Sequence, residues 1–210
     1  MRIQRFGITL VQLAEERIEM VRQWRNSPRI SEFMEFRETI TPPMQQTWFR
    51  SLDGLRDFYF LIEYHGEPVG LIHTSHIDWK EKTGHSGLFI HKNELLGTHV
   101  PVLASLSMVD FFFSFCNLET LFAKVLDENA VAVKYNAALG FKPAEPEGNR
   151  FRHYRLRKED YFTATAHLRT LAKALDSCDN ILEIERGLYN RLQSENVFSP
   201  LKTGMEIKFF

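Results

Sequence analysis

The sequence predicts an α/β (α+β) fold in which a mixed, mostly antiparallel sheet carries helices on both faces and a helical hairpin follows at the C-terminus. Three observations support this fold class. Strands follow one another directly in the first half of the chain, strands and helices alternate after residue 100, and spacing is purely helical after residue 156. The chain has 210 residues, of which 44% are hydrophobic, enough for one domain with an appendage. We expect the domain to span residues 1–160 and the helical extension to span residues 161–210.

The N-terminal region predicts one strand followed by short helices. Residues 8–11 alternate weakly between apolar and polar, whereas the next segment has helical spacing until Pro28 stops it. Thr41 can cap a further helix, with proline in its first turn. The expected elements are a strand over residues 8–11 and helices over residues 14–24, over residues 30–36 and from residue 41 onward.

The middle of the chain predicts three consecutive antiparallel strands. Residues 58–64 and 69–77 are rich in aromatic and β-branched side chains, and they flank a turn that contains Gly66 and Pro68. A polar turn over residues 80–84 then leads into a third strand over residues 85–90.

The next segment alternates helices and strands. Residues 100–117 are apolar on nearly every side of a helix, which places that helix inside a layered structure. A strand over residues 121–126 precedes a helix over residues 129–139, and Gly140 provides a left-handed cap. Two further strands are expected at residues 141–142 and 151–156.

The C-terminal segment predicts a helical hairpin. Its first helix has Leu168, Leu171, Ala172 and Leu175 on one face. Asn180 and Glu183 form a capping-box pattern that would open a second helix, with Ile181, Ile184, Leu188 and Leu192 turned inward. The apolar stripe must be covered either by the sheet or by a second copy of the chain in a homodimer. A dedicated partner-binding module is the alternative.

Composition disfavours several classes of protein. Lys and Arg total 26 against 27 Asp and Glu, so a net charge of −1 gives no field that would attract nucleic acid or an anionic membrane. No run reaches the roughly 20 apolar residues of a membrane span, and the N-terminus lacks a signal-peptide pattern. Cys116 and Cys178 are too few for a disulfide framework. We therefore expect a cytoplasmic protein with no nucleic-acid or membrane partner.

Four stretches of the sequence carry a family resemblance. The most specific is Asn129 with Leu139-Gly140-Phe141, because an Asn opens a helix ending in Leu-Gly-Phe in that family. With this spacing, residues 6–160 resemble the GNAT superfamily of acyl-CoA-dependent N-acetyltransferases. The start of the chain resembles the branch that acetylates ribosomal protein N-termini and nucleotide-linked amino sugars. The other stretches are Trp24-Arg25-Asn26 with Ile40 and Trp48, Phe60-Leu61-Ile62-Glu63 with Pro68-Val69-Gly70, and Gly87-Leu88-Phe89-Ile90.

The resemblance implies transfer of an acetyl group from acetyl-CoA to a primary amine of a small molecule or peptide. The amine would attack directly, without a covalent enzyme intermediate and without a metal. A nucleotide-linked amino sugar and a protein N-terminus are both open as acceptors. The alternative is a catalytically degenerate GNAT-fold protein that binds a ligand or partner.

The resemblance also implies where acetyl-CoA binds. The donor would lie between two parallel strands that splay apart, with its pyrophosphate on the N–H groups that begin the following helix. At the family's phosphate loop, Arg/Gln-x-x-Gly-x-Gly/Ala, this chain reads Glu94-Leu95-Leu96-Gly97-Thr98-His99, which keeps only the first glycine. Thr98 is a candidate cap of that helix. The expected cofactor-binding residues are Leu88, Phe89, Ile90, Leu95, Leu96, Gly97, Thr98, His99, Asn129 and Asn136.

Catalysis would need a base for the amine and an acid for the departing thiolate. His76 with Asp78 as its orienting carboxylate is one candidate base, because the two share a strand face. His85, at the start of the strand that faces the thioester, is the other. Alternation turns His73 away from that face, which disfavours a metal site with His76 and Asp78. Many family members have a tyrosine that acts as the general acid at the position where this chain has Asn136. Tyr135, one position earlier, is the remaining catalytic candidate, and the alternative is a partly buried tyrosine of the helix without a catalytic role.

The N-terminal helices would cover the acceptor end of the site. An arginine beside aromatic rings suits a phosphate-bearing or sugar substrate, through its fork of donors and through stacking. The alternative is a structural arginine that caps a helix end above core tryptophans. The expected substrate-binding residues are Trp24, Arg25, Asn26, Phe36, Arg37 and Trp48.

Overall fold

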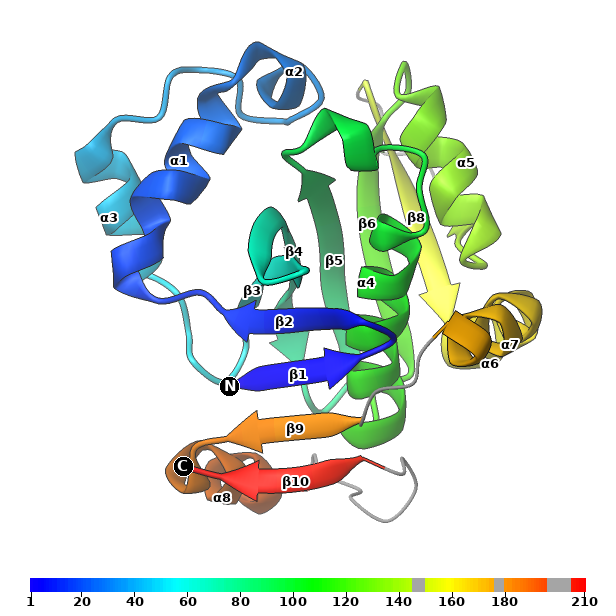
Figure 1. The fold of residues 1–210 in the computed structure, drawn as a ribbon. Coiled ribbons are helices and arrows are strands. Elements are labelled where there is room, and N and C mark those ends of the chain that lie inside the picture. The colour runs from blue at the N-terminus through cyan, green and yellow to red at the C-terminus, as the bar shows by residue number, and fades with distance from the viewer. Residues whose placement is uncertain (145–149, 176–179, 196–204) are drawn as a thin grey trace.

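The computed structural model describes residues 1–144, 150–175, 180–195 and 205–210, with a single sheet at its centre (Figure 1). Neighbouring strands are antiparallel except in two parallel pairs, Thr83–Ile90 with Thr120–Leu126 and Ile181–Ile184 with Glu206–Phe209. The sheet is therefore mixed and mostly antiparallel, as predicted. In spatial order its strands are β10 (Glu206–Phe209), β9 (Ile181–Ile184), β1 (Arg2–Arg5), β2 (Ile8–Gln12), β3 (Phe58–Tyr64), β4 (Glu67–Asp78), β5 (Thr83–Ile90), β6 (Thr120–Leu126), β8 (Phe151–Arg157) and β7 (Lys142–Pro143).

Helices of the described residues cover both faces of this sheet. None of them is long and apolar enough to cross a membrane. The α-helices are α1 (Ile18–Asn26), α2 (Pro28–Ser31), α3 (Pro42–Arg50), α4 (Val100–Asp110), α5 (Ala130–Ala138), α6 (Lys158–Ala164), α7 (Ala166–Leu175) and α8 (Arg186–Ser194), with short turns η1 (Glu15–Arg17), η2 (Asn93–Leu95) and the π-helical η3 (Phe111–Phe115).

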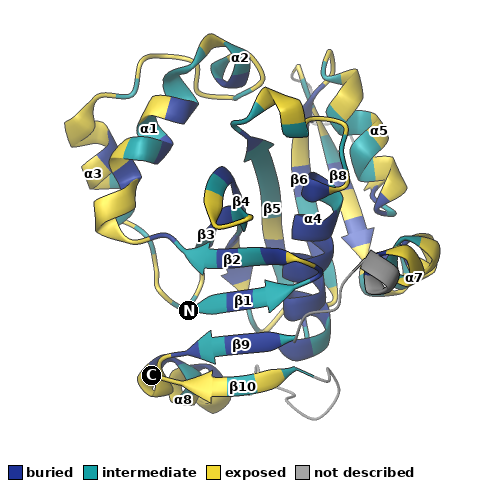
Figure 2. Ribbon diagram, in the orientation of Figure 1, coloured by how far each residue is buried: buried dark blue, intermediate teal, exposed yellow. Residues whose placement is uncertain are grey.

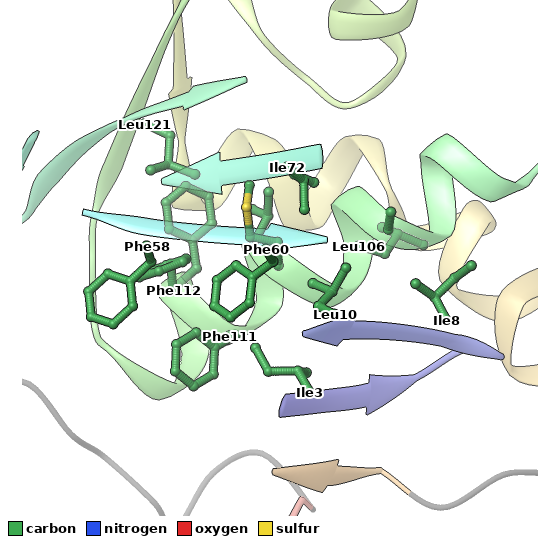
Figure 3. Packing of buried hydrophobic residues seen from close by; sticks show 14 of the residues in the cluster. Ile3, Ile8, Leu10, Phe58, Phe60, Ile72, Leu106, Phe111, Phe112 and Leu121 are labelled. Carbon is green, nitrogen blue, oxygen red and sulfur yellow. The ribbon is translucent and has the colours of Figure 1, made fainter. Parts of the chain in front are cut away.

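Helix α4 lies inside the molecule, as its apolar sequence predicts. Every residue of α4 except Val102 is buried, and Figure 2 shows it as a dark blue element behind β1 and β2. Figure 3 shows how Phe58 and Phe60 of β3 point toward Phe111 and Phe112 at the end of this helix. The alternate β3 residues pack with α1 in a second cluster on the other face of the sheet. The two faces therefore carry separate cores.

Two hairpins use turns whose central residues both have positive φ. His65 and Gly66, with φ of 51° and 79°, join β3 to β4 as the sequence predicted. Phe6 and Gly7, with φ of 53° and 70°, join β1 to β2. Such turns match the twist of the strands that they connect. Strand β1 was not predicted, because its four residues are too few to show alternation.

The short helix after α1 differs from the prediction. Helix α2 begins at Pro28, which suits a first helical turn, and it ends at Ser31 instead of spanning residues 30–36. Phe33 and Phe36 follow it with 39% and 42% of their surface exposed. Helix α3 begins as predicted, with the Thr41 hydroxyl accepting a hydrogen bond from the Met44 N–H at 3.4 Å.

Helix α5 confirms the predicted cap and stop. The Asn129 side chain accepts a hydrogen bond from the Ala132 N–H at 3.0 Å. After the helix, Gly140 has a φ of 95°, and a Cβ at this position would lie 3.0 Å from the Asp160 carbonyl oxygen. Only glycine fits a left-handed turn this close to another backbone.

The C-terminal segment corrects the expected helical hairpin. Residues 181–184 form strand β9, which pairs antiparallel with β1 and parallel with β10, so Asn180 and Glu183 do not open a helix. The unpaired edge of β1 and the burial of three apolar side chains in β9 favour the strand over the local capping pattern. Helix α8 turns Leu188 and Leu192 inward as predicted, so this chain itself covers them.

Some expectations about the C-terminal segment remain open. Leu168 of α7 packs against the main core, whereas Leu171 is 49% exposed. The side chain of Leu175 and the whole of Cys178 lie outside the described residues. The division at residue 160 and a homodimer through the C-terminal helices stay predictions.

A buried ionic cluster ties α6 and α7 to the core. Asp110, with 1% of its surface exposed, accepts hydrogen bonds from Tyr161 at 2.7 Å and from Arg169 at 2.8 Å. Arg5 of β1 forms an ion pair with the same carboxylate at 3.0 Å. Arg169 also lies over the rings of Tyr161 and Phe162. This carboxylate is therefore satisfied from three different elements, which we call the Asp110 cluster.

Candidate active site

The site begins where β5 and β6 separate. The two strands pair through only three positions, the last of which joins His85 to Phe122. Both strands continue, β5 to Ile90 and β6 to Leu126, but the ladder between them stops. Leu88, Phe89 and Ile90 therefore lie on the stretch of β5 that has no partner on the β6 side. The structure contains the divergence that the family resemblance implied.

The loop before α4 offers hydrogen-bond donors to an anion. The N–H groups of Gly97, His99 and Val102 have no acceptor among the described residues. Gly97 has a φ of 78°, and a Cβ built on it would have no atom within 4 Å, so the loop is open there. Free N–H groups and the helix dipole together favour a phosphate at such a position. These residues fit the pyrophosphate of acetyl-CoA.

The side chains that differ from the family's phosphate-loop pattern point to different places. His99 lies with its Nε2 atom 3.3 Å from the Tyr64 hydroxyl, so its ring contacts the end of β3. Glu94 is exposed, Leu96 is 49% exposed, and Leu95 packs against the core. The N-cap position of α4 is His99 and not Thr98, although the Thr98 hydroxyl does accept a hydrogen bond from the Val100 N–H at 3.2 Å.

Tyr135 joins α5 to α4. Its hydroxyl donates to the Pro101 carbonyl oxygen at 2.8 Å and lies 2.6 Å from the Ser105 hydroxyl. Burial raises the pKa of Tyr135, so the phenol holds its proton firmly. This geometry favours a structural contact over the role of general acid. The backbone carbonyl oxygen of Asn136 accepts a hydrogen bond from the N–H of Phe141, which follows the end of the helix.

The predicted pair of His76 and Asp78 is not formed. The β4–β5 register shifts between Ser75 and Asp78, and His76 sits there with a φ of 50°. Its N–H donates to the Asp57 carboxylate at 2.9 Å, while the Asp78 carboxylate accepts the N–H groups of the following turn at 2.9 Å. The bulge breaks the strand alternation on which the prediction rested.

Ser75 instead joins two histidines. Its hydroxyl oxygen lies 3.2 Å from Nδ1 of His73 and 3.1 Å from Nδ1 of His76. Ser75 is 2% exposed and faces His85 across the strand pair, and the His85 ring lies 5.8 Å from the His76 ring. We call His73, Ser75, His76 and His85 the histidine cluster. Among the described residues, no group of three or more His, Cys, Asp and Glu side chains is placed to hold a metal ion.

His73 has the most perturbed environment in this cluster. Its ring stacks on Tyr59 with 4.8 Å between centroids, and its Nε2 atom would lie 2.8 Å from a Cβ at residue 87. Gly87 therefore makes room for the imidazole on β5. Burial lowers the pKa of His73 to about 4, and the charges of Arg25, His76 and His85 lower it further against the opposing carboxylate of Asp57.

Arg25 is a partly buried cation that forms no ion pair with a carboxylate of the described residues. Its Nε atom is buried and makes no hydrogen bond, and burial lowers its pKa although Tyr59 acts in the opposite direction. Tyr59 contacts Trp48 edge to face at 5.0 Å. Arg25, Trp48, Tyr59 and His73 thus form one wall beside the histidine cluster.

The other expected substrate residues lie elsewhere. Trp24 is 7% exposed and stacks on His91, and Asn26 holds the N–H and carbonyl of Ile40 through its side-chain amide, both at 2.9 Å. Phe36 and Arg37 lie on the exposed segment after α2, where Arg37 donates to the Met34 carbonyl oxygen. Sequence reasoning missed Asp57, Tyr59 and Ser75. The pattern His-Thr-Ser-His at residues 73–76 was the available signal.

Similarity to known proteins identifies the family of this chain. Residues 8–142 match the family model of the acetyltransferase (GNAT) domain. No curated protein sequence is similar enough to count as a relative. Similar solved structures include a domain from Methanocaldococcus jannaschii, with 21% identity, a TM-score of 0.64 and coverage of 71% of this chain and 97% of that one.

Two other similar structures are of enzymes whose substrates are named. The apo form of FdhC, a nucleotide-linked sugar GNAT, has 16% identity and a TM-score of 0.67 over 80% of this chain and 97% of that chain. Spermidine N-acetyltransferase from Vibrio cholerae, in complex with CoA and spermine, has 16% identity and a TM-score of 0.65 over 74% and 98%. This chain thus belongs to the GNAT acetyltransferase family, whose members transfer an acetyl group from acetyl-CoA to an amine.

Proposed function

We propose that this acetyltransferase acts on the primary amine of a nucleotide-linked amino sugar. The observation that carries the proposal is the environment of Arg25, which is partly buried, has a buried Nε atom without a hydrogen bond and forms no ion pair with a carboxylate of the described residues. A buried charge without a partner costs several kcal/mol, on the order of the cost of breaking a buried ion pair. An anionic substrate group would remove that cost, and a phosphate matches the fork of an arginine with two parallel hydrogen bonds.

The surrounding residues favour a phosphorylated acceptor over a polyamine. Trp48 and Tyr59 present aromatic rings beside Arg25, and such rings can stack on a base or a sugar. The Asp57 carboxylate acts electrostatically on His73 of this wall. It already accepts hydrogen bonds from the backbone N–H groups of His76 and Asp53. A polyamine would meet the charge of Arg25 without a free carboxylate to bind it. This distinction favours the chemistry named for FdhC over that named for the spermidine enzyme.

The residues of the chain divide the work of the reaction. Acetyl-CoA supplies the activated acetyl group. The free N–H groups of Gly97, His99 and Val102 would hold its diphosphate, and the unpaired stretch of β5 would line its path toward the histidine cluster. The histidines there are the side chains available to take the proton of the amine. Cys116 is buried, and burial raises the pKa of its thiol. Because the thiolate is the nucleophilic form, this environment favours direct attack by the amine over a route through an acyl-cysteine at this residue.

A titration with acetyl-CoA and with CoA tests the donor site. We expect binding to the native protein, and a loss of about 100-fold in affinity for Gly97→Asp, because the carboxylate would stand at the diphosphate. Gly7→Asp is the matched control, since Gly7 also has a positive φ and open space around its Cβ position. Equal losses in both variants would show that backbone strain, and not the loop, controls affinity.

A comparison of acceptors tests the substrate class. We expect acetylation of UDP-glucosamine used as a probe, with a KM about 10-fold to 100-fold higher for Arg25→Met, which is the effect of losing a charge-assisted hydrogen bond. Arg37→Met, at an exposed arginine of the same region, should leave KM unchanged. Acetylation of spermidine or of a peptide N-terminus in preference to the nucleotide sugar would overturn the proposal.

A cytoplasmic location stays a prediction.

A further inference from the structure

We propose that His73, Ser75 and His76 form a proton relay, which carries the proton of the acceptor amine from the inner part of β5 to the protein surface. The proposal rests on acetyl transfer to an amine at this site. It adds a path for the proton, and it assigns a role to a serine that stands outside the expected catalytic set.

The three side chains form a continuous path. At its inner end, Nε2 of His73 lies against Gly87, on the stretch of β5 that has separated from β6. Nδ1 of the same ring lies 3.2 Å from the Ser75 hydroxyl oxygen, which lies 3.1 Å from Nδ1 of His76. His76 is exposed, so its Nε2 atom can exchange protons with water. The path therefore runs from the separated strand to solvent through two imidazoles and one hydroxyl.

Hydrogen-bond inventory fixes how the relay can work. A serine hydroxyl has one proton, so Ser75 can donate to only one of its two imidazole neighbours and must accept from the other. The Tyr59 hydroxyl also interacts with Ser75, and it must then donate its own proton to the serine oxygen. When Nδ1–H of His73 donates to Ser75 and Ser75 donates to His76, the Nε2 atom of His73 keeps a free lone pair beside Gly87. That arrangement leaves the proton acceptor at the inner end of the path, where the amine would react.

Each transfer in this arrangement balances. An N–H bond of the amine breaks as an N–H bond forms at Nε2 of His73. The Nδ1–H proton of His73 then passes to the Ser75 oxygen, and the Ser75 proton passes to Nδ1 of His76. His76 releases its Nε2 proton to water, so no net charge remains on the protein. Transfer of one proton back along the same path, from water at Nε2 of His76 to the inner end, would restore the starting tautomers and supply the proton that the departing thiolate needs.

The charges around the relay favour transfer of the proton along the path and disfavour its retention on His73. Arg25 from α1, with His76 and His85, disfavours a positive charge on His73, Asp57 favours one, and the Tyr59 ring stacks on the imidazole. The cations and burial together disfavour a lasting imidazolium at His73. The Asp57 carboxylate accepts the backbone N–H of His76, so negative charge lies at the outer end of the path. A positive charge therefore gains stability as it moves outward.

Nitrogen NMR of the histidine rings tests the relay without any substrate. We expect His73 of the ligand-free protein to be neutral at pH 7 with its proton on Nδ1, and Ser75→Ala to change that tautomer or the chemical shift of Nδ1. Ser86→Ala, at a half-buried serine opposite Thr74, is the matched control. A His73 proton on Nε2 in the native protein would overturn the proposal, whether or not acetyl transfer is detected.

Kinetics with UDP-glucosamine as the probe acceptor test the same path in turnover. We expect Ser75→Ala and His76→Ala to lower kcat by about 10-fold to 100-fold, within the range of general-base effects, with an unchanged KM for acetyl-CoA. Imidazole in the buffer should restore the His76→Ala variant, whose missing group is exposed, but not Ser75→Ala. Wild-type kcat in Ser75→Ala would overturn the relay, whereas no turnover by the native protein would count against the proposed acceptor alone.

Discussion

Two polar clusters lie on opposite faces of the sheet, and they differ in how far their charges are satisfied. In the Asp110 cluster, one carboxylate meets two guanidinium groups and a tyrosine hydroxyl, contributed by β1, α6 and α7. In the wall beside the histidine cluster, Arg25 has no carboxylate partner among the described residues, and His73 is held neutral by burial.

Under the proposed function, this difference separates a structural site from one that binds a ligand. Buried polar groups in folded proteins are nearly always paired, so a saturated cluster needs no further explanation than the elements it joins. An unsaturated cluster keeps a free energy cost that a substrate can remove. Both clusters contain arginine beside aromatic rings, so composition alone does not distinguish them. The carboxylate partner does: Arg5 and Arg25 both have a buried Nε atom without a hydrogen bond, but Arg5 forms an ion pair with Asp110 and Arg25 has no such partner among the described residues.

The largest expected effect is on the Asp110 cluster. Asp110→Asn leaves the charges of Arg5 and Arg169 without compensation and should lower the free energy of unfolding by about 3–5 kcal/mol. Denaturation in urea measures this loss. Asp160→Asn is the control, because Asp160 pairs with a Lys142 that is 66% exposed and such pairs contribute little. A loss below that of the control would refute the structural role.

An intermediate effect is expected from the pH dependence of stability. Because the folded pKa of His73 is about 4 and the unfolded value is near 6.5, the unfolded chain binds more protons between these values, and stability falls as the pH falls through that window. His73 should account for about 2 kcal/mol of the loss between pH 7 and pH 5. His73→Gln should remove that part, and His167→Gln, at an exposed histidine, should not.

The smallest expected effect is at Arg25. Replacing a buried, unpaired charge with an apolar side chain of similar length costs little, so Arg25→Met should change the free energy of unfolding by less than about 1 kcal/mol or increase it. Arg169→Met, which removes a partner of Asp110, should cost several times more. Comparable losses for the two arginines would show that Arg25 has a structural partner after all.

The sequence predicted those parts of the fold whose signals are local. The hairpin of β3 and β4, the buried helix α4 and the Asn129 cap each depend on neighbouring residues, and each is confirmed. Strands β1 and β9 have four residues each and pair across the whole length of the chain. At Asn180 and Glu183 the local pattern favoured a helix, and the partner strand that reversed it is invisible in a short window.

The site was predictable by residue type but not by pairing. Arg25, Trp48, His76 and His85 were identified, and they lie together. The connection of His76 to Ser75 was missed because strand alternation would turn the side chains of residues 75 and 76 to opposite faces. The bulge with its left-handed residue brings them within hydrogen-bond distance. A single irregular residue therefore decided which groups could share a proton.

The pairing of β9 with β1 has a consequence for how the chain is made. Residues 2–5 leave the ribosome long before residues 181–184, the strand that covers their outer edge. Through most of synthesis, β1 is thus an open sheet edge with unpaired N–H and carbonyl groups, which can pair with another chain. The order of translation, and not the finished fold, therefore exposes this edge of β1 to aggregation until β9 has been made.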